Sequence, residues 1–298
     1  MLSILIPIYN FDVRSFVNKL HKQAIDENIL FEILLVDDAS ENTFRKINKS
    51  LNELKFVNYF QLEKNIGRSK IRNLLAEKAK YEYLLFADCD TDVFSANFIK
   101  NYIQNIEKQS VICGGITYSK EKPENSDLFF RWYYGNNREK SSAEKRNKKP
   151  YDSFMSGNFL IPKTVFEKIK FDEKISEYGH EDTLFGIELQ RKEIDIKHIY
   201  NPLIHIGLEG SKTFILKTKK GIDNLIYLVK NYKYPELFEN IKLLKTYKKT
   251  KNLSFLFRLF FIFFHQAIEK NLCGTRPRLK LFDLYKLSYL HSIIKTQK

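Results

Sequence analysis

The feature that most constrains the fold is a regular alternation of apolar runs and amphipathic segments in residues 1–90. Four apolar runs have the length and composition of buried strands, at 2–8, 31–36, 57–62 and 83–87. Between the first two, apolar residues recur at helical spacing: Val13, Phe16, Val17, Leu20 and Ala24. Strands that alternate with helices form a parallel, doubly wound sheet. The sequence therefore predicts an α/β domain with a mainly parallel, Rossmann-like sheet.

Polar residues follow each of these predicted strands. Ligands of open parallel sheets bind outside the carboxyl ends of the strands. We therefore expect the side chains at these ends to share one rim and to form a site, although each alone could be an ordinary turn or cap. They are Tyr9, Asp37 with Asp38, Gly67 with Arg68, and Asp88 with Asp90.

The most informative of these clusters is Asp88-Cys89-Asp90, which ends the fourth strand with two carboxylates. Carboxylates beside a buried strand are costly unless a cation meets them, and Mg²⁺ or Mn²⁺ prefers such hard oxygen ligands. An acidic loop is the alternative for this motif by itself, but its place on a shared rim favours a metal site. His205, which follows the last predicted strand, is a candidate third ligand beside Asp90, or else a structural histidine.

Further along the chain, strands are predicted at 111–118, 154–162 and 194–200, with a helix at about 95–107. Residues 119–152 mix Lys, Glu, Asn and Pro with aromatic residues, and they indicate a mobile excursion or lid. Gly179-His180-Glu181-Asp182 opens another helix. Acids there can cap the helix and complement its dipole, or they can supply a general base.

The net charge of +14 lies entirely in the last 88 residues, which contain 19 Lys and Arg against 5 Asp and Glu. This asymmetry predicts a catalytic domain at 1–210 and a basic helical region at 211–298, with helices at 212–231, 235–249, 253–272 and 280–295. The run 255–264 is strongly aromatic. It either packs against the domain or rests on an anionic membrane surface, and no motif indicates nucleic acid.

Cys89, Cys113 and Cys273 are widely spaced, and we expect reduced thiols in a cytoplasmic protein. The first residues indicate a strand and not a signal peptide. No apolar run reaches the roughly 18 residues that a membrane span requires.

Five motifs in order resemble glycosyltransferase family 2, whose members are inverting enzymes with the GT-A fold. The resemblance covers about residues 1–210. The motifs are Ile6-Pro7-Ile8-Tyr9-Asn10, Val36-Asp37-Asp38-Ala39-Ser40, Asn65-Ile66-Gly67-Arg68 with Arg72-Asn73, Asp88-Cys89-Asp90 and Gly179-His180-Glu181-Asp182.

The resemblance implies a role for each site residue. Pro7 and Tyr9 would flank the nucleotide base, and Asp38, rather than Asp37, would bind it. Apart from the resemblance, the position of Arg68 just after Gly67 at a helix start places it to reach a phosphate, or else it is an ordinary solvated arginine. Asp88 would approach the ribose or the metal, and Asp90 and His205 would bind Mn²⁺ or Mg²⁺ on the diphosphate. Asp182 would be the base that deprotonates the acceptor hydroxyl, and Glu181 would orient either that base or the acceptor.

Two departures from the family pattern concern the acceptor. His180 stands where an aromatic or small residue is commoner, so its acceptor contacts are open. The Q-x-x-R-W signature of processive members is absent at Gln190-Arg191-Lys192, which favours one sugar per encounter.

The sequence thus predicts a metal-dependent inverting glycosyltransferase of hexosyl or N-acetylhexosaminyl type. It would use a nucleoside-diphosphate sugar, UDP-linked, and a saccharide or lipid-linked acceptor, in bacterial cell-surface polysaccharide synthesis at the inner face of the plasma membrane. The alternatives are a sugar nucleotidyltransferase and a catalytically silent membrane-surface protein of the same fold. The donor sugar, the acceptor and the oligomeric state are not readable from the residues; we expect 119–152 and the surroundings of Tyr178–His180 to select the acceptor.

Overall fold

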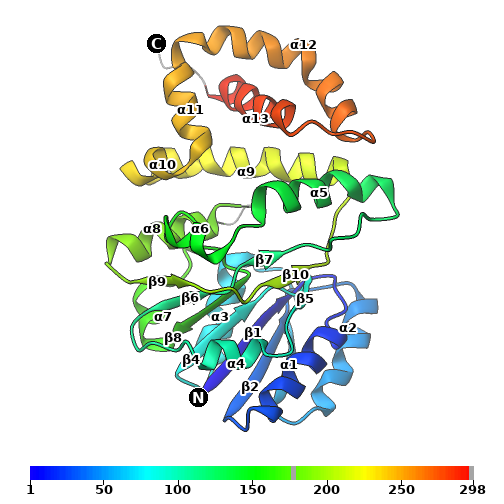
Figure 1. Ribbon diagram of the computed structural model, residues 1–298, viewed down its shortest axis with the longest axis vertical. Helices are drawn as coiled ribbons and strands as arrows, with labels where there is room; N and C mark the ends of the chain where they lie inside the picture. The colour runs from blue at the N-terminus through cyan, green and yellow to red at the C-terminus, as the bar shows by residue number, and fades with distance from the viewer. Residues whose placement is uncertain (176–178, 295–298) are drawn as a thin grey trace. The chain divides into compact units, whose positions relative to one another are not determined.

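The computed structural model describes residues 1–175 and 179–294 (Figure 1). The described chain forms two compact units. The first unit contains residues 1–119, 139–175 and 181–207, and the second contains 120–138, 179–180 and 208–294. The sequence analysis placed a single boundary at residue 210, whereas residues 120–138, which precede it, group with the second unit.

The first unit is built on a seven-stranded sheet with strand order β3-β2-β1-β4-β8-β6-β9. The first four strands in that order are parallel, β8 is antiparallel to both of its neighbours, and β9 is parallel to β6. This confirms the predicted α/β fold with a mainly parallel sheet. The strands are β1 (Leu2–Ile8), β2 (Phe31–Asp37), β3 (Val57–Gln61), β4 (Tyr83–Ala87), β6 (Val111–Cys113), β8 (Asn158–Pro162) and β9 (Ile196–His198).

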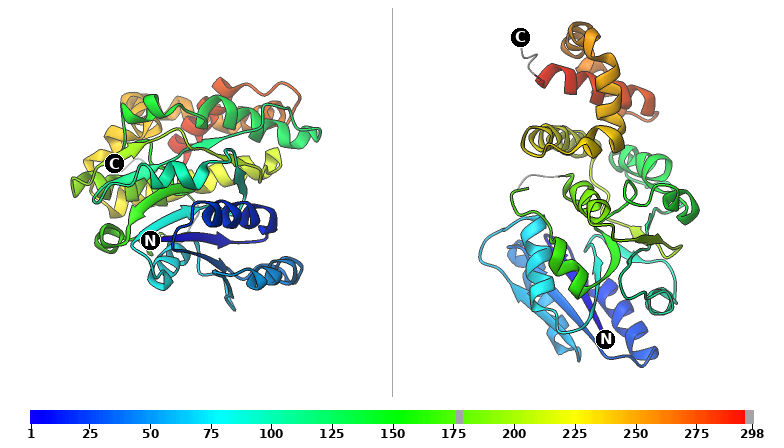
Figure 2. Two further views of the ribbon diagram at one scale, coloured as in Figure 1. Left: turned by 60° about the horizontal axis from the view of Figure 1, so that its bottom comes forward. Right: turned by 90° about the vertical axis from the view of Figure 1, so that its left-hand side faces the viewer.

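Alternate side chains of the strands fill two cores, one on each face of the sheet, and helices cover both faces (Figure 2). Ile4 and Ile6 of β1 pack with α1 and α4, while Leu5 packs on the opposite face with α3, α7 and α8. The predicted apolar stripe of α1 is buried. The helices are α1 (Arg14–Asp26), α2 (Asn42–Asn48), α3 (Arg68–Lys78), α4 (Phe98–Ile103), α6 (Ala143–Asn147), α7 (Lys163–Ile169) and α8 (Glu181–Arg191).

A second, three-stranded sheet of the first unit was not predicted. Its strand order is β5-β10-β7, from β5 (Thr91–Val93), β10 (Leu203–His205) and β7 (Ile116–Thr117). The single strand expected at 111–118 is therefore wrong: it is broken into β6 and β7, which belong to different sheets. Gly114 and Gly115 cause the break. Gly115 has φ +84°, and a Cβ on Gly114 would lie 2.3 Å from the carbonyl oxygen of Asn201.

Residues 119–152, expected as an irregular excursion, contain regular structure. They include α5 (Phe129–Tyr134), followed by a π-helical turn over Gly135–Glu139, and α6. Helix α5 belongs to the second unit, and α6 to the first.

The second unit is helical, as predicted. Its core joins Phe130 of α5 with α9, α12 and α13, through Phe214, Leu272 and Phe282. The helix expected at 235–249 is two helices, because the chain is extended at Ile241. No helix in the described part of the chain is long and apolar enough to cross a bilayer. The C-terminal helices are α9 (Ser211–Asn231), α10 (Pro235–Asn240), α11 (Lys242–Thr250), α12 (Ser254–Leu272) and α13 (Leu279–Ile293).

Candidate active site

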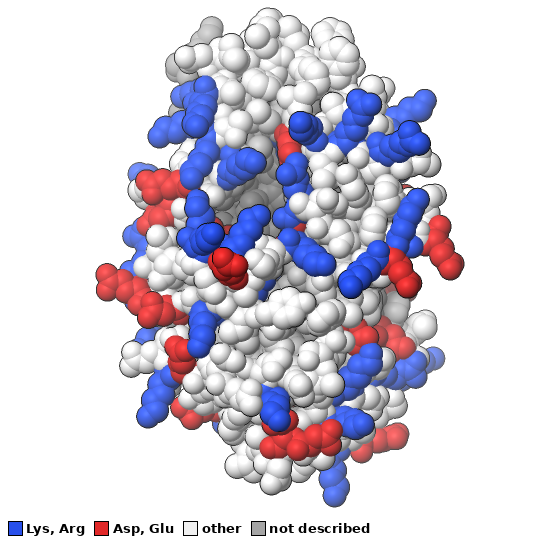
Figure 3. Space-filling view, viewed as in Figure 1, with Lys and Arg blue, Asp and Glu red and all other residues white. Residues whose placement is uncertain are grey.

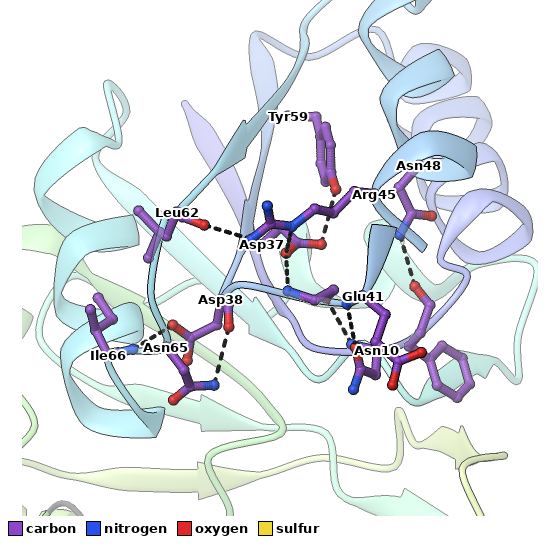
Figure 4. A network of polar contacts seen from close by, with 12 residues as sticks. Asn10, Asp37, Asp38, Glu41, Arg45, Asn48, Tyr59, Leu62, Asn65 and Ile66 are labelled. Carbon is purple, nitrogen blue, oxygen red and sulfur yellow. Dashed lines mark hydrogen bonds and ion pairs between the residues drawn. The ribbon is translucent and has the colours of Figure 1, made fainter. Parts of the chain in front are cut away.

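The loop after β2 is fixed by Asp37, which is fully buried (Figure 4). One carboxylate oxygen accepts a hydrogen bond from the amide of Ser40 at 2.7 Å, and the other accepts one from the hydroxyl of Tyr59 at 2.9 Å. Arg45 lies 3.7 Å away. With both carboxylate oxygens occupied and no exposure, Asp37 has a structural role.

Asp38 anchors the loop that starts α3 (Figure 4). Its two carboxylate oxygens accept hydrogen bonds from the amides of Ile66, at 2.7 Å, and Gly67, at 3.1 Å. Burial raises the pKa of Asp38 above its ordinary value, although these two amide bonds act in the opposite direction. Gly67 has φ +85° and ψ 167°, a conformation open essentially to glycine alone. Asp38 is 5% exposed, so any further hydrogen bond must come from a group that enters this rim.

Two arginines one turn apart on α3 connect the fourth strand to helix α8. Arg72 is buried and lies 2.5 Å from one carboxylate oxygen of Asp88. Arg68 lies 2.5 Å from Glu181 and 4.0 Å from the other oxygen of Asp88. The Arg68 side chain is 45% exposed. These contacts bring together two predicted motifs that are far apart in the sequence.

Strand β8 sets the position of Asp88 from behind. The Asp88 amide donates to the carbonyl of Gly157 at 3.1 Å. A Cβ on Gly157 would lie only 2.6 Å from a carboxylate oxygen of Asp88. Any larger residue at 157 would therefore displace this carboxylate.

Asp90 has a different partner, His205. In the second sheet β10 pairs with β5 so that His205 lies opposite Thr91, and the His205 Nε2 is 3.4 Å from a carboxylate oxygen of Asp90. Burial favours a higher pKa for Asp90, but the hydrogen bond and charge of His205, with Arg68, outweigh it and lower the pKa. Gly207 packs against Asp90, since a Cβ there would lie 2.5 Å from the Asp90 Cβ.

The pair Asp90 and His205 fits a divalent metal in its donor chemistry. A carboxylate oxygen and an imidazole nitrogen suit Mn²⁺, and neighbouring ligands of an octahedral ion with bonds of about 2.1 Å lie about 3 Å apart. The structure does not bring Asp88 into this pair, because two arginines engage it. Among residues 1–175 and 179–294, no three His, Cys, Asp or Glu side chains gather as a metal cluster. A metal would therefore need further oxygens from its substrate and from water.

Glu181 and Asp182 begin α8 and have different surroundings. Glu181 is buried and bound to Arg68. Asp182 accepts a hydrogen bond from the amide of Thr183 at 2.7 Å. Burial, reinforced by the charge of Glu181, raises the pKa of Asp182 to about 6, although Thr183 and the arginines act the other way. A carboxylate with this pKa is a good general base near neutral pH.

The remaining predicted residues lie near the end of β1 and directly before α8. Tyr9 is 54% exposed directly after β1, and Pro7 is half-buried within that strand. Gly179 and His180 both have left-handed φ angles before α8, while Tyr178 lies outside the described residues. Arg72 belongs to one of the sequence motifs, but no role was predicted for it. Its place four residues after Arg68 on a predicted helix was the available signal.

Comparisons with known proteins agree with this geometry. The family model described as Glycosyl transferase family 2 matches residues 3–170. An uncharacterized glycosyltransferase of Rickettsia felis is 29% identical over 118 residues, which are 40% of this chain and 19% of that protein. The poly(ribitol-phosphate) beta-N-acetylglucosaminyltransferase TarP of Staphylococcus aureus is 25% identical over 224 residues, which are 70% of this chain and 63% of TarP. The chain thus spans about a fifth of the Rickettsia relative and under two thirds of TarP.

Two solved structures share the fold. The Pyrobaculum calidifontis mannosyltransferase PcManGT, in complex with GDP-Man and Mn²⁺, has a TM-score of 0.57 at 12% identity and covers 83% of this chain and 69% of its own. S. aureus TarS 1–349, in complex with UDP, has a TM-score of 0.52 at 17% identity and covers 97% of this chain and 89% of its own. At such identities the likeness establishes the fold, which is of GT-A type. Because the family model spans more than half of the chain, the chain belongs to glycosyl transferase family 2.

Proposed function

We propose that this enzyme moves a hexosyl or N-acetylhexosaminyl group from a UDP-linked sugar to a hydroxyl group of a saccharide or glycolipid acceptor, with inversion at the anomeric carbon. The observation that carries the proposal is the link from Asp88 through Arg68 to Glu181, next to a base of raised pKa, Asp182. This link joins the residues proposed to bind the diphosphate to the residues proposed to face the acceptor, all within the first unit.

The residues divide the chemistry between them. The Asp182 carboxylate takes the proton of the acceptor hydroxyl, whose oxygen then attacks the anomeric carbon. The bond from that carbon to the diphosphate breaks, and the diphosphate leaves with the electron pair. Arg68 offers a guanidinium to the departing negative charge, and Glu181 holds that guanidinium in place.

A divalent metal, Mn²⁺ or Mg²⁺, is part of the proposal. Asp90 and His205 would hold it, and when bound it would act as a Lewis acid on the diphosphate. Asp38 and Tyr9 would contact the nucleotide base, with Pro7 beside it, and Asp88 would face the ribose. The Mn²⁺ in the PcManGT complex and the UDP in the TarS complex support this assignment of metal and nucleotide.

For the acceptor, we propose only its chemical class. TarP is named for transfer to poly(ribitol-phosphate), which supports a polyhydroxylated acceptor in bacterial cell-surface polysaccharide synthesis. The glycosyltransferase relatives also favour sugar transfer over the alternative chemistry of a sugar nucleotidyltransferase.

A thermal-shift screen tests the donor class. The chain is heated with UDP, UDP-GlcNAc, UDP-glucose or GDP-mannose, each with and without MnCl₂, because a ligand of the native state raises the melting temperature. We expect UDP and a UDP-sugar to raise it, and more strongly with Mn²⁺. UDP release is then measured with candidate polyol and saccharide acceptors. Stabilisation by no nucleotide sugar would overturn the donor assignment, and binding without transfer to any acceptor would favour the silent binding protein.

A further inference from the structure

Helix α12 presents an apolar face to solvent along most of its length. Between Ser254 and Ile268 the only Lys, Arg, Asp or Glu is Arg258. Five large apolar side chains of this stretch are 51–73% exposed, which is unusual, because soluble proteins rarely expose large contiguous apolar patches. These five residues, called the α12 face below, are Phe255, Leu256, Ile262, Phe263 and Phe264.

The fold fixes the direction in which the α12 face points. On the other side of the helix, Ser254 contacts the ring of His291 at 2.9 Å. Arg258 donates to the carbonyls of His291, at 2.9 Å, and Ile294, at 2.6 Å. Phe257 stacks on the His291 ring with 4.6 Å between centroids. Because α13 packs closely against the inner side of α12, the fold itself keeps the aromatic residues of the α12 face at the surface.

Basic side chains flank the α12 face at both ends. Every one of the following lysines and arginines is exposed. Figure 3 shows the same arrangement: the end of the second unit formed by α12 is free of charged side chains, and blue side chains gather next to it. They are Lys242, Lys245, Lys248, Lys249 and Lys251 before the helix, and Lys270, Arg276, Arg278 and Lys280 after it.

We propose that the α12 face binds an anionic lipid surface. Its aromatic and aliphatic residues would enter the boundary between headgroups and acyl chains, while the flanking cations meet the lipid phosphates. The helix would lie on the membrane and would not cross it. This inference goes beyond sugar transfer and does not depend on it. It implies a peripheral position at the cytoplasmic leaflet of the plasma membrane.

The charges favour this occupant over two others. A second copy of the chain would bring an identical basic rim against this one, and like charges repel at such distances. A nucleic acid duplex would satisfy the cations with its phosphates, but its bases are stacked on one another and would offer nothing to the apolar centre of the face. An anionic bilayer satisfies both parts of the surface together.

Vesicle flotation with the full chain tests the proposal. We expect binding to vesicles of phosphatidylcholine with phosphatidylglycerol, weak binding to phosphatidylcholine alone, and loss of binding at high salt. A variant with Phe255→Ser and Phe263→Ser should bind the anionic vesicles more weakly by about tenfold at least, because two buried phenyl groups are lost. A variant with Lys245→Gln, Lys248→Gln and Lys249→Gln should lose the preference for anionic lipid.

The matched control carries Leu30→Ser and Leu216→Ser, which remove two other exposed apolar side chains, 70% and 58% exposed. We expect this control to float like the wild type. All variants alter exposed side chains, so unchanged circular dichroism and melting temperature are expected and show that the fold is intact. Equal flotation of wild type and the phenylalanine variant would overturn the proposal. So would a dimer in sedimentation velocity that the phenylalanine variant abolishes while vesicle binding is absent.

Discussion

Arg68 and Arg72 decide how the carboxylates of the site are used. They lie four residues apart on α3 and therefore on one side of the helix. Arg72 neutralises Asp88 from a buried position, and Arg68 neutralises Glu181. Asp182 is bound instead by a backbone amide. Two of the three acids are thus paired with guanidinium groups, and the third has a pKa raised to about 6, which suits proton transfer.

Replacing the base tests this division. Asp182→Asn should lower kcat by about 10²–10⁴-fold, the usual contribution of a general base, and leave UDP affinity unchanged. For the wild type we expect kcat to fall as the pH decreases through about 6, because the carboxylate becomes protonated. Asp12→Asn, at an exposed acid paired with Arg14, is the control and should behave like the wild type. A kcat for Asp182→Asn within a few-fold of the wild type would contradict the assignment.

Removing the metal tests the pair Asp90 and His205. EDTA should abolish transfer, and MnCl₂ should restore it. In Asp90→Asn, the extra melting-temperature shift that Mn²⁺ gives to the UDP complex should disappear, because one of two protein ligands becomes a weaker donor. Asp92→Asn is a close control, since Asp92 lies two residues after Asp90, on β5, but pairs with Lys19 at 2.5 Å. A full Mn²⁺ effect in Asp90→Asn would remove Asp90 from the metal site.

At the scale of single residues, the sequence predicted which residues lie in the site but not which groups they contact. Asp88, Asp90, Glu181 and Asp182 follow from motifs at predicted strand and helix ends. No role was assigned to Arg72, because its spacing from Arg68 indicates the same side of a helix but not that the side chain is buried against Asp88. The separation of Asp88 from Asp90 also depends on tertiary contacts, with arginines on one side and His205 on the other.

At the scale of elements, two backbone segments shape the Asp88-Cys89-Asp90 loop. Gly157, directly before β8, lies behind Asp88, and Gly207, shortly after β10, lies behind Asp90. Neither position has space for a methyl group, so the two carboxylates are set by strands that come much later in the chain.

Gly157→Ala should therefore disturb the site more than the fold. We expect a loss of about 1–3 kcal/mol in unfolding free energy from overpacking, together with weaker UDP binding, because the new methyl group displaces the Asp88 carboxylate. Isothermal titration and urea unfolding measure the two effects. Gly274→Ala is the control: its Cβ would lie 3.3 Å from the nearest atom, and UDP affinity should not change. Unaltered UDP affinity in Gly157→Ala would show that Asp88 does not contact the nucleotide.

The secondary-structure elements differ in how clearly the sequence predicts them. Strands β1 to β4 were predicted because each is a largely apolar run of five to seven residues bounded by polar turns; β1, β2 and β4 are almost wholly buried, whereas β3 is exposed at its end. The three-stranded sheet was missed because its strands have two or three residues, too few for any period. The break at Ile241 was missed because no Gly or Pro marks it, and the chain still carries helix-forming residues on both sides.

At the scale of the whole molecule, buried histidines make stability depend on pH in both units. In the first unit, His198 accepts a hydrogen bond from Arg146 at Nδ1 and contacts the carbonyl of Pro150 through Nε2, so it is neutral. In the second unit, His291 lies between the hydroxyls of Thr250 and Ser254, at 2.9 Å from each. Burial lowers the pKa of both to about 4.

The sign of the effect follows from these values. Above pH 6.5, the ordinary pKa of histidine, neither the folded nor the unfolded chain holds the proton, and stability is constant with respect to these groups. As the pH falls from 6.5 to about 4, the unfolded chain takes up protons that the folded chain refuses, so stability falls. The loss reaches about 3 kcal/mol for each histidine.

Urea unfolding between pH 7 and pH 4.5 should therefore show a falling midpoint, and His198→Gln and His291→Gln should each flatten the slope while lowering stability at pH 7. Carboxylates titrate in the same pH range in the wild type and in every variant, so the difference between two slopes measures the contribution of the histidine. His21→Gln, at a surface histidine bound to the carbonyl of Lys55, is the control and should keep the wild-type slope. If His198→Gln and His291→Gln also kept the wild-type slope, neither ring would be protonated preferentially in the unfolded chain. If both flatten it, each unit contains its own acid-sensitive core, because the two rings belong to separate sets of contacts.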